Sequence, residues 1–155
     1  KRPAAGMLRS DMTPMEFIAT LSENLDSVPG ASGVNNHEGS ALTENRQAMN
    51  FLMSELKSRS LFFLDSYTDA KSTAQASAKE FGLRTARRDV FLDNDSDHPA
   101  AIRKQLAELM RIAKQNGSAV AIGHPRAATL AELRKWMPEA AEAGIEIVPL
   151  SRLVQ

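Results

Sequence analysis

The chain has 155 residues, of which 43% are hydrophobic and 25% charged, and its formal net charge is zero. This composition is typical of one globular domain with a hydrophobic core, and the balanced charge argues against nucleic acid or an anionic membrane surface as a partner. The sequence has no cysteine, which excludes disulfides and thiolate chemistry, and no apolar run long enough for a membrane span.

Residues 1–13 show no hydrophobic period and are expected to form an extended lead-in to a single α/β domain over residues 14–155. Because the first residue is Lys1 rather than Met, we interpret the chain as a trimmed piece of a longer protein. Thr13 and Pro14 suit the N-cap and the first position of a helix. The apolar stripe of this helix has helical spacing and comprises Phe17, Ile18, Leu21, Leu25 and Val28.

A short buried strand is predicted next, over residues 31–34. Thr43 is then predicted to cap a second helix. The apolar residues of that helix follow a one-face pattern and are Met49, Leu52, Met53 and Leu56. Residues 61–64 form a continuous apolar run of strand length, and an alanine-rich segment over residues 70–81 indicates a weaker helix. A third strand is expected within residues 83–91.

The last third of the sequence repeats the same alternation of helix and strand. Asp97 or Ser96 is predicted to cap a helix whose inward residues are Ile102, Leu106, Leu109, Met110 and Ala113. A buried strand is expected over residues 119–122. Thr129 is predicted to cap a final helix, whose inward residues are Leu130, Leu133, Met137 and Ala140. A last strand is predicted over residues 145–148.

Helix and strand alternate throughout with short connections, which predicts an α/β fold with parallel strands joined by right-handed crossovers. The predicted strands are apolar rather than alternating, as expected when helices cover a sheet. Two architectures fit this order. One is an open, doubly wound sheet, and the other is a (β/α) barrel whose opening strands lie outside this chain.

Parallel α/β folds place functional groups where strands end and the following loops begin. His37 follows the first predicted strand, Asp65 the second and His124 the fourth. Side-by-side strands would bring these three side chains to one rim, and two imidazoles with a carboxylate suit zinc or another divalent metal. Such a metal would activate water, and a carboxylate or a spare imidazole would move the proton.

Each of these residues also has an ordinary structural interpretation. Asp65 suits an N-cap or an Asx-turn, and His37 and His124 suit hydrogen bonds within loops. Asp93 begins an acidic stretch over residues 93–97 that is expected to be a solvated capping loop. The functional interpretation is favoured because several polar groups coincide on one predicted edge.

Four motifs together resemble the divergent polysaccharide deacetylase family of bacterial envelopes. They are residues 33–40 (GVNNHEGS), 63–66 (FLDS), 88–93 (RDVFLD) and 121–125 (AIGHP). Their order and spacing match over almost the entire chain. The resemblance implies a NodB-like, distorted parallel-strand (β/α) barrel of about seven strands, with the opening strands missing from this chain. It also implies export to the periplasm or cell envelope.

The resemblance further implies roles for individual residues. His37 matches a metal-ligand histidine, and His124 matches the late-strand histidine that acts as general acid or as a second ligand, with zinc as the expected metal. Arg88 and Asp89 resemble the segment that orients the catalytic carboxylate. Asp65 has no secure counterpart in ordinary deacetylases and is a catalytic candidate from its position after the second predicted strand. Other polar residues of the first two motifs are expected to bind substrate: Asn35, Asn36, Glu38, Ser40 and Ser66.

The implied activity is metal-dependent removal of N-acetyl groups from an amino-sugar glycan of the envelope. Ala41 stands where ordinary deacetylases carry another metal-ligand histidine, so the alternative is a non-catalytic carbohydrate-binding or regulatory protein on the same scaffold. A sugar- or phosphate-binding module without metal is a third hypothesis. A barrel without its opening strands exposes sheet edges. The chain alone is therefore expected to be inactive and to associate with missing strands or with itself through those edges.

Overall fold

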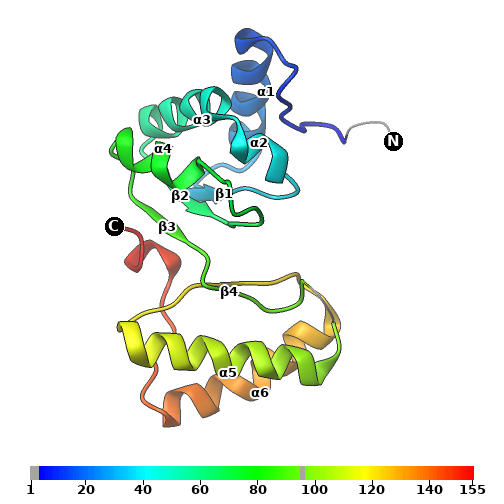
Figure 1. Ribbon diagram of the computed structural model, residues 1–155, viewed down its shortest axis with the longest axis vertical. Coiled ribbons are helices and arrows are strands. Elements are labelled where there is room, and N and C mark those ends of the chain that lie inside the picture. The colour runs from blue at the N-terminus through cyan, green and yellow to red at the C-terminus, as the bar shows by residue number, and fades with distance from the viewer. Residues whose placement is uncertain (1–3, 95–96) are drawn as a thin grey trace. The chain divides into compact units, whose positions relative to one another are not determined.

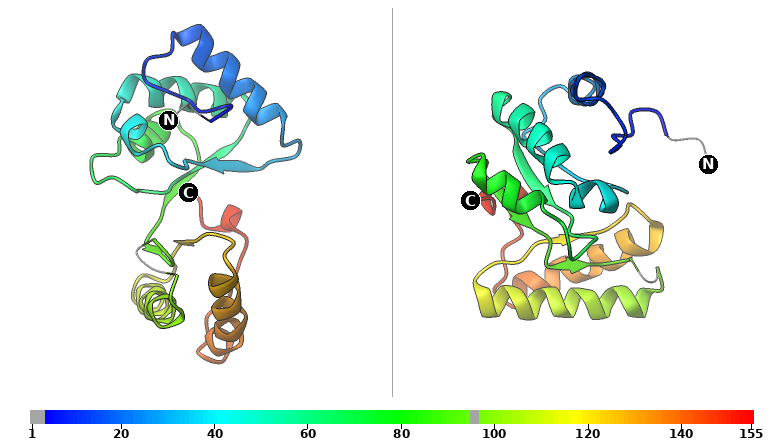
Figure 2. Two further views of the ribbon diagram at one scale, coloured as in Figure 1. Left: turned by 90° about the vertical axis from the view of Figure 1, so that its right-hand side faces the viewer. Right: turned by 45° about the horizontal axis from the view of Figure 1, so that its top comes forward.

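The computed structural model describes residues 4–94 and 97–155, whose course is drawn in Figures 1 and 2. The chain divides into two compact units, Lys1–Arg87 with Val154–Gln155, and Arg88–Leu153. The described strands form two parallel sheets, one in each unit. The predicted α/β class with parallel strands is therefore confirmed. None of the described helices is long and apolar enough to cross a membrane.

The first unit is a three-stranded parallel sheet with helices packed on it. Its elements are α1 Pro14–Asp26, β1 Gly33–Asn35, α2 Ser40–Glu44, α3 Arg46–Ser58, β2 Phe62–Asp65, α4 Ala74–Glu80 and β3 Thr85–Arg87. The strand order is β1-β2-β3, with Val34 opposite Phe63 and Leu64 opposite Ala86. Helices α3 and α4 contact the sheet, and α1 packs on α3 (Figure 1).

Helix α1 begins where the sequence predicts. The Thr13 hydroxyl accepts the N–H of Glu16, and the Glu16 carboxylate accepts the N–H of Thr13 at 2.8 Å. This reciprocal capping box satisfies donors that the first turn of a helix leaves without a partner. The cap predicted at Thr13 and the proline at the first helical position are both confirmed.

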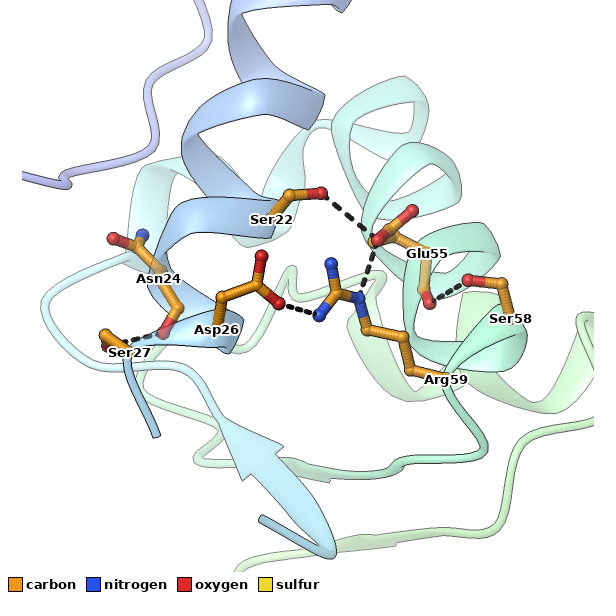
Figure 3. Close-up of polar contacts among 7 residues, drawn as sticks. All are labelled: Ser22, Asn24, Asp26, Ser27, Glu55, Ser58 and Arg59. Carbon is orange, nitrogen blue, oxygen red and sulfur yellow. Dashed lines mark hydrogen bonds and ion pairs between the residues drawn. The ribbon is translucent and has the colours of Figure 1, made fainter. Parts of the chain in front are cut away.

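The core of the first unit lies between its helices and β2. Its buried apolar residues are Phe17, Leu21, Ala48, Met49, Leu52, Met53, Leu56, Phe63, Ala74, Ala78 and Leu83. At one end of the contact between α1 and α3, the guanidinium of Arg59 forms ion pairs with Asp26 of α1 at 2.5 Å and with Glu55 of α3 at 2.7 Å (Figure 3). The hydroxyl of Ser22 donates to the same Glu55 carboxylate at 3.2 Å, so α1 and α3 are joined by polar contacts outside the core.

Thr43 does not cap the second helix, which corrects the prediction. The segment forms two helices, α2 and α3, and the N-cap of α3 is Asn45, whose side chain accepts the N–H of Ala48 at 3.1 Å. Thr43 is buried in α2, and its hydroxyl donates to the carbonyl of Ser40. Its carbonyl accepts both the N–H and the hydroxyl of Thr73. Tertiary contacts with the loop before α4 therefore decide the role of Thr43.

The single strand predicted within residues 83–91 is two strands that belong to different sheets. Thr85–Arg87 (β3) pairs with β2, and its first residue exchanges backbone hydrogen bonds of 2.8 and 3.2 Å with Gln155. Val90–Phe91 (β4) pairs with β5 of the second unit, and its first residue donates to the carbonyl of Val120. A continuous run of suitable residues does not reveal that the pairing partner changes within it.

The second unit contains a two-stranded parallel sheet and two long helices, which contact each other side by side (Figure 2). Its elements are β4, α5 Pro99–Asn116, β5 Ala121–Ile122, α6 Ala127–Glu142 and the 3₁₀ turn η1 Leu150–Arg152. The N-cap of α5 is His98, whose Nδ1 accepts the N–H of Ala100 at 3.3 Å. The predicted cap at Asp97 is one residue too early, and Ser96 lies outside the described residues.

Helix α6 begins before the predicted cap. Arg126 is its N-cap and Thr129 lies within the first turn, buried, so the capping prediction for Thr129 is wrong. Leu130 and Met137 were expected to face inward, but they are 43% and 47% exposed. Leu133 and Ala140 do face inward as predicted, and Trp136, which was not among the predicted residues, packs beside Leu133.

The strand predicted over residues 145–148 does not form. The N–H of Ile145 donates to the carbonyl of Ala140 at 2.9 Å, which extends the end of α6, and Ile147 is 52% exposed. A β-branched run becomes a strand only when a neighbouring backbone supplies hydrogen-bond partners. No described strand pairs with this segment.

Candidate functional site

The carboxyl ends of β4 and β5 bring Asp93 and His124 together. Val90 lies opposite Ala121 in this parallel pair, so the residues three positions further on leave the sheet at the same edge. Asp93 Oδ1 lies 2.8 Å from His124 Nδ1. Asp93 Oδ2 accepts the backbone N–H of His124 at 2.9 Å. The two residues therefore contact each other through side chain and backbone at once.

Thr129 completes the surroundings of this carboxylate. Its hydroxyl donates to Asp93 Oδ2 at 2.7 Å, and both residues are only 1% exposed. Burial by itself raises the pKa of a carboxyl group, but the hydrogen bonds from Thr129 and His124 outweigh it and hold the pKa of Asp93 below its ordinary value. Asp93 is therefore ionised at neutral pH.

An ionised carboxylate can only accept hydrogen bonds, so the charge on Asp93 decides which nitrogen of His124 carries hydrogen. Nδ1 donates to Asp93, and Nε2 becomes the nitrogen that can take up or release a proton or bind a metal. The His124 side chain is 32% exposed, which leaves it accessible to a substrate. A buried carboxylate behind a partly exposed imidazole is an arrangement that orients a histidine for proton transfer.

An aromatic ring lies beside the imidazole, and an arginine contacts each of Phe91 and Asp93. The rings of Phe91 and His124 lie 5.6 Å apart between centroids, and the guanidinium of Arg88 lies 5.4 Å from the Phe91 centroid. Arg126 Nη1 donates to the backbone carbonyl of Asp93 at 3.0 Å. The cluster of Asp93, His124 and Thr129 therefore has the positive charge of Arg126 next to it.

Asp89 lies at the opposite end of β4 from Asp93. Its carboxylate accepts the N–H of Val120 at 2.8 Å, and its own N–H donates to the carbonyl of that residue. These bonds join the start of β4 to the segment before β5. The catalytic roles predicted for Asp89 and Arg88 stay predictions.

The carboxyl edge of the first sheet gathers several of the predicted substrate-binding residues. Asn35 Nδ2 donates to the hydroxyl of Ser66 at 3.0 Å, and Asn36 Oδ1 accepts the N–H of Ser66 at 2.8 Å. The Ser66 hydroxyl donates in turn to the carbonyl of Asn36. The ends of β1 and β2 are thereby tied together, which holds His37 and Glu38 on the exposed loop that follows β1.

Asp65 organises the loop that follows β2. It is 1% exposed, and it accepts the N–H of Tyr67 and the hydroxyl of Ser72, each at 2.8 Å. This contact is the Asx-type turn that its sequence context allows. Tyr67 has a left-handed backbone, with φ of 46°, and its ring lies 4.2 Å from the guanidinium of Arg87. Ser40 reaches the same loop through a 2.9 Å bond to Thr68.

The described donors do not make a complete metal centre. Among residues 4–94 and 97–155, no three His, Asp or Glu side chains are grouped so that they could hold an ion. Asp65 is engaged by the loop after β2, and Asp93 by His124 and Thr129. His37 belongs to the first unit and His124 to the second, so their predicted convergence stays a prediction.

Asp93 is the candidate that the sequence interpretation assigned wrongly. It was expected in a solvated capping loop, yet it is buried and bonded to His124. The spacing that brings them together has meaning only once the strand register is known. Asp93 follows Val90 by as many residues as His124 follows Ala121, and these two residues are opposite each other in the parallel pair.

Comparisons with known proteins agree over nearly the whole chain. A family model described as divergent polysaccharide deacetylase matches residues 1–154. An uncharacterised protein of Haemophilus influenzae is 44% identical over 148 residues, which cover 96% of this chain and 52% of that protein. The uncharacterised protein YibQ of Escherichia coli is 39% identical over 130 residues, which cover 84% of this chain and 40% of that protein.

A solved structure is also similar. The crystal structure of an uncharacterised protein of Agrobacterium tumefaciens matches with a TM-score of 0.94 and 30% identity, covering 99% of this chain and 62% of that one. The chain therefore spans only part of the length of each of these relatives.

Proposed function

The chain belongs to the divergent polysaccharide deacetylase family, and from this premise we propose that it supplies the proton-transfer part of an N-deacetylase site acting on envelope glycan. The observation that carries the proposal is the contact of buried Asp93 with partly exposed His124, 2.8 Å between Oδ1 and Nδ1. Thr129 fixes the other carboxylate oxygen at 2.7 Å. Such an oriented imidazole can donate the proton that the leaving nitrogen needs in amide hydrolysis.

In this reaction a water molecule gives a proton to a general base as its oxygen adds to the acetyl carbonyl, and the bond between the carbonyl carbon and the amide nitrogen then breaks. The nitrogen leaves as an amine only if it receives a proton. His124 donates that proton from Nε2, and the charge of Asp93 stabilises the protonated imidazole before the transfer. The products are acetate and a sugar with a free amino group.

Zinc dependence remains part of the proposal through His37 and His124, the metal-ligand candidates of the resemblance. The described donor set does not fit a zinc centre by itself. The proton transfer from His124 is therefore derived without one. Arg88, Asp89 and Asp65 are proposed to support the catalytic groups.

The remaining parts of the proposal concern substrate, architecture and location. The substrate-binding edge comprises Asn35, Asn36, Glu38, Ser40 and Ser66. The two parallel sheets are proposed to belong to a distorted (β/α) barrel of about seven strands, in a protein of the periplasm or cell envelope. Polysaccharide or amino-sugar glycan is the proposed partner.

A carbohydrate-binding protein without catalysis is the second candidate function. Ala41 in place of a histidine removes one donor from the loop after β1. This alternative predicts glycan binding without release of acetate.

The test is acetate release from N-acetylated glycans by the full-length protein, with and without added zinc. We expect release that falls roughly a hundredfold or more in His124→Asn, because the leaving amine loses its acid. His98→Asn is the matched control, since His98 caps α5 and Asn is also a good N-cap. Failure to release acetate under any metal condition would remove the deacetylase proposal and leave the binding protein.

A further inference from the structure

Arg126 contacts both residues of the proton-transfer pair, His124 through its backbone and Asp93 through its side chain. Its backbone N–H donates to the carbonyl of His124 at 2.7 Å, a tight turn around Pro125. Its Nη1 donates to the carbonyl of Asp93 at 3.0 Å. The guanidinium is thereby fixed next to the proposed acid rather than left on a mobile side chain.

This guanidinium has no carboxylate partner among the described residues. The nearby carboxylate of Asp93 accepts from Thr129 and from His124 instead. Arg126 is exposed, and it uses one of its donors on a backbone carbonyl. A guanidinium presents five N–H donors in a planar fork that matches carboxylate and phosphate groups. Its remaining donors suit an anionic group that comes from outside the described chain.

Phe91 lies between Arg88 and the imidazole of His124 as a ring that contacts both. Arg88 is held over Phe91 at 5.4 Å from the ring centroid, and Phe91 in turn lies 5.6 Å from the His124 ring. The acidic member of the cluster, Asp93, is buried. The positive charge that the described contacts place directly beside the Asp93–His124 pair is the guanidinium of Arg126, which favours an anionic group there.

We propose that Arg126 is a specificity-determining residue of the His124 site and binds an anionic group, carboxylate or phosphate, carried by the glycan. This inference rests on the proposed deacetylase function for the identity of the substrate, but the binding preference can be measured without catalysis. It narrows the substrate class from N-acetylated glycans in general to acidic ones. Arg126 binds and positions the sugar and transfers no proton.

The first test is binding to the full-length protein at low salt, followed by NMR or calorimetry. The probes are neutral N-acetylglucosamine, its 6-phosphate, and N-acetylmuramic acid, which carries a carboxylate. We expect at least one anionic probe to bind about tenfold more tightly than the neutral sugar. The anionic probe that binds more tightly identifies phosphate or carboxylate as the recognised group.

Three variants test whether Arg126 causes the preference for anionic over neutral sugars. Arg126→Gln should abolish the preference, and Arg126→Lys should keep part of it, because lysine retains the charge but not the fork. Arg134→Gln removes an equal charge from an exposed position on the same helix and should keep all of it. Equal binding of neutral and anionic probes, or an unchanged preference in Arg126→Gln, would overturn the inference.

Kinetics separate recognition from a merely structural role. Recognition predicts that Arg126→Gln raises KM for acidic glycan about tenfold more than it raises KM for neutral glycan. Misplacement of Asp93 through the lost 3.0 Å bond would instead lower kcat on both substrates, and that result would count against the inference. A protein that releases no acetate but shows the anionic preference would refute the proposed function and uphold the role of Arg126.

Discussion

At the scale of single residues, Asp93 contributes both to the stability of the second unit and to the orientation of the proposed catalytic histidine. Its buried carboxylate receives two hydrogen bonds from His124 and one from Thr129. An ionised group in such a place is stable only while its donors remain. The contacts that hold the pKa of Asp93 below its ordinary value therefore also fix the ring of His124.

The free energy of unfolding should depend on pH in a way that reveals the ionised carboxylate of Asp93. A carboxyl group whose pKa is lowered by folding stabilises the native state above its unfolded pKa, about 3.9 for aspartate. That contribution is lost as the pH falls through the lower, folded value. We expect Asp93→Asn to cost about 1–3 kcal/mol of unfolding free energy at pH 7 and progressively less below about pH 4.

Urea unfolding of both proteins between pH 7 and pH 3 measures this difference. Asp97→Asn alters an exposed carboxylate nearby and serves as the control, with no expected change. A constant difference between wild type and Asp93→Asn over this pH range would contradict the assignment of a buried, ionised Asp93.

At the scale of elements, close packing between β1 and β2 constrains the strand that leads to His37. Gly33 lies opposite Phe62, and a Cβ atom on Gly33 would stand 2.3 Å from Cδ2 of that ring. Just before β3, Arg84 has its guanidinium 6.0 Å from the Phe62 centroid. The ring therefore occupies the space that a side chain at position 33 would need.

Gly33→Ala should destabilise the protein by about 1–3 kcal/mol, because the ring or the strand must shift to admit the methyl group. Gly39→Ala is the matched control, since its nearest atom outside the adjoining residues, the carbonyl oxygen of His37, would be at an ordinary 3.7 Å. Thermal or urea unfolding checks both variants. Equal stability of the two would show that the packing of Phe62 adapts without cost.

At the scale of the whole molecule, the chain returns to its first unit at the end. Val154 is buried, and Gln155 exchanges two backbone hydrogen bonds with Thr85 on β3. The outer side of β3 is thereby partnered by a segment that follows the entire second unit in sequence. Such a contact has a large sequence separation and costs conformational entropy to form.

Gln155→Pro should lower the unfolding free energy by about 1–2 kcal/mol, because it removes the N–H that donates to the carbonyl of Thr85. Gln155→Ala keeps that N–H and should behave as wild type. Hydrogen exchange of the Thr85 amide, which donates to the carbonyl of residue 155, provides a local measure. If the Thr85 amide were equally protected from hydrogen exchange in both variants, the backbone hydrogen bonds between Gln155 and β3 would add no stability.

Local signals predicted much of this architecture. Thr13 and Pro14 mark the start of α1 because a cap depends on neighbouring residues only. Residues 62–65 form a buried strand, as the apolar run around them indicates. The polar residues after predicted strands also located the edge that holds His124.

Local signals failed where a distant partner decides the outcome. Residues 145–148 have strand-like residues but no paired neighbour, and the run over residues 83–91 changes its partner midway. Thr43 and Thr129 have the chemistry of caps, yet both are buried and use their hydroxyls elsewhere. The extent of one domain over residues 14–155 stays a prediction, as does the convergence of His37 on His124.

The amino-acid sequence by itself determined the α/β class, the main helices and the family, because periodicity, caps and motifs are properties of neighbouring residues. Only the tertiary structure placed Asp93 behind His124 and set Arg126 beside them. These contacts join residues about thirty positions apart, 93 with 124 and 126. Their geometry depends on the register of β4 against β5, which no local pattern specifies.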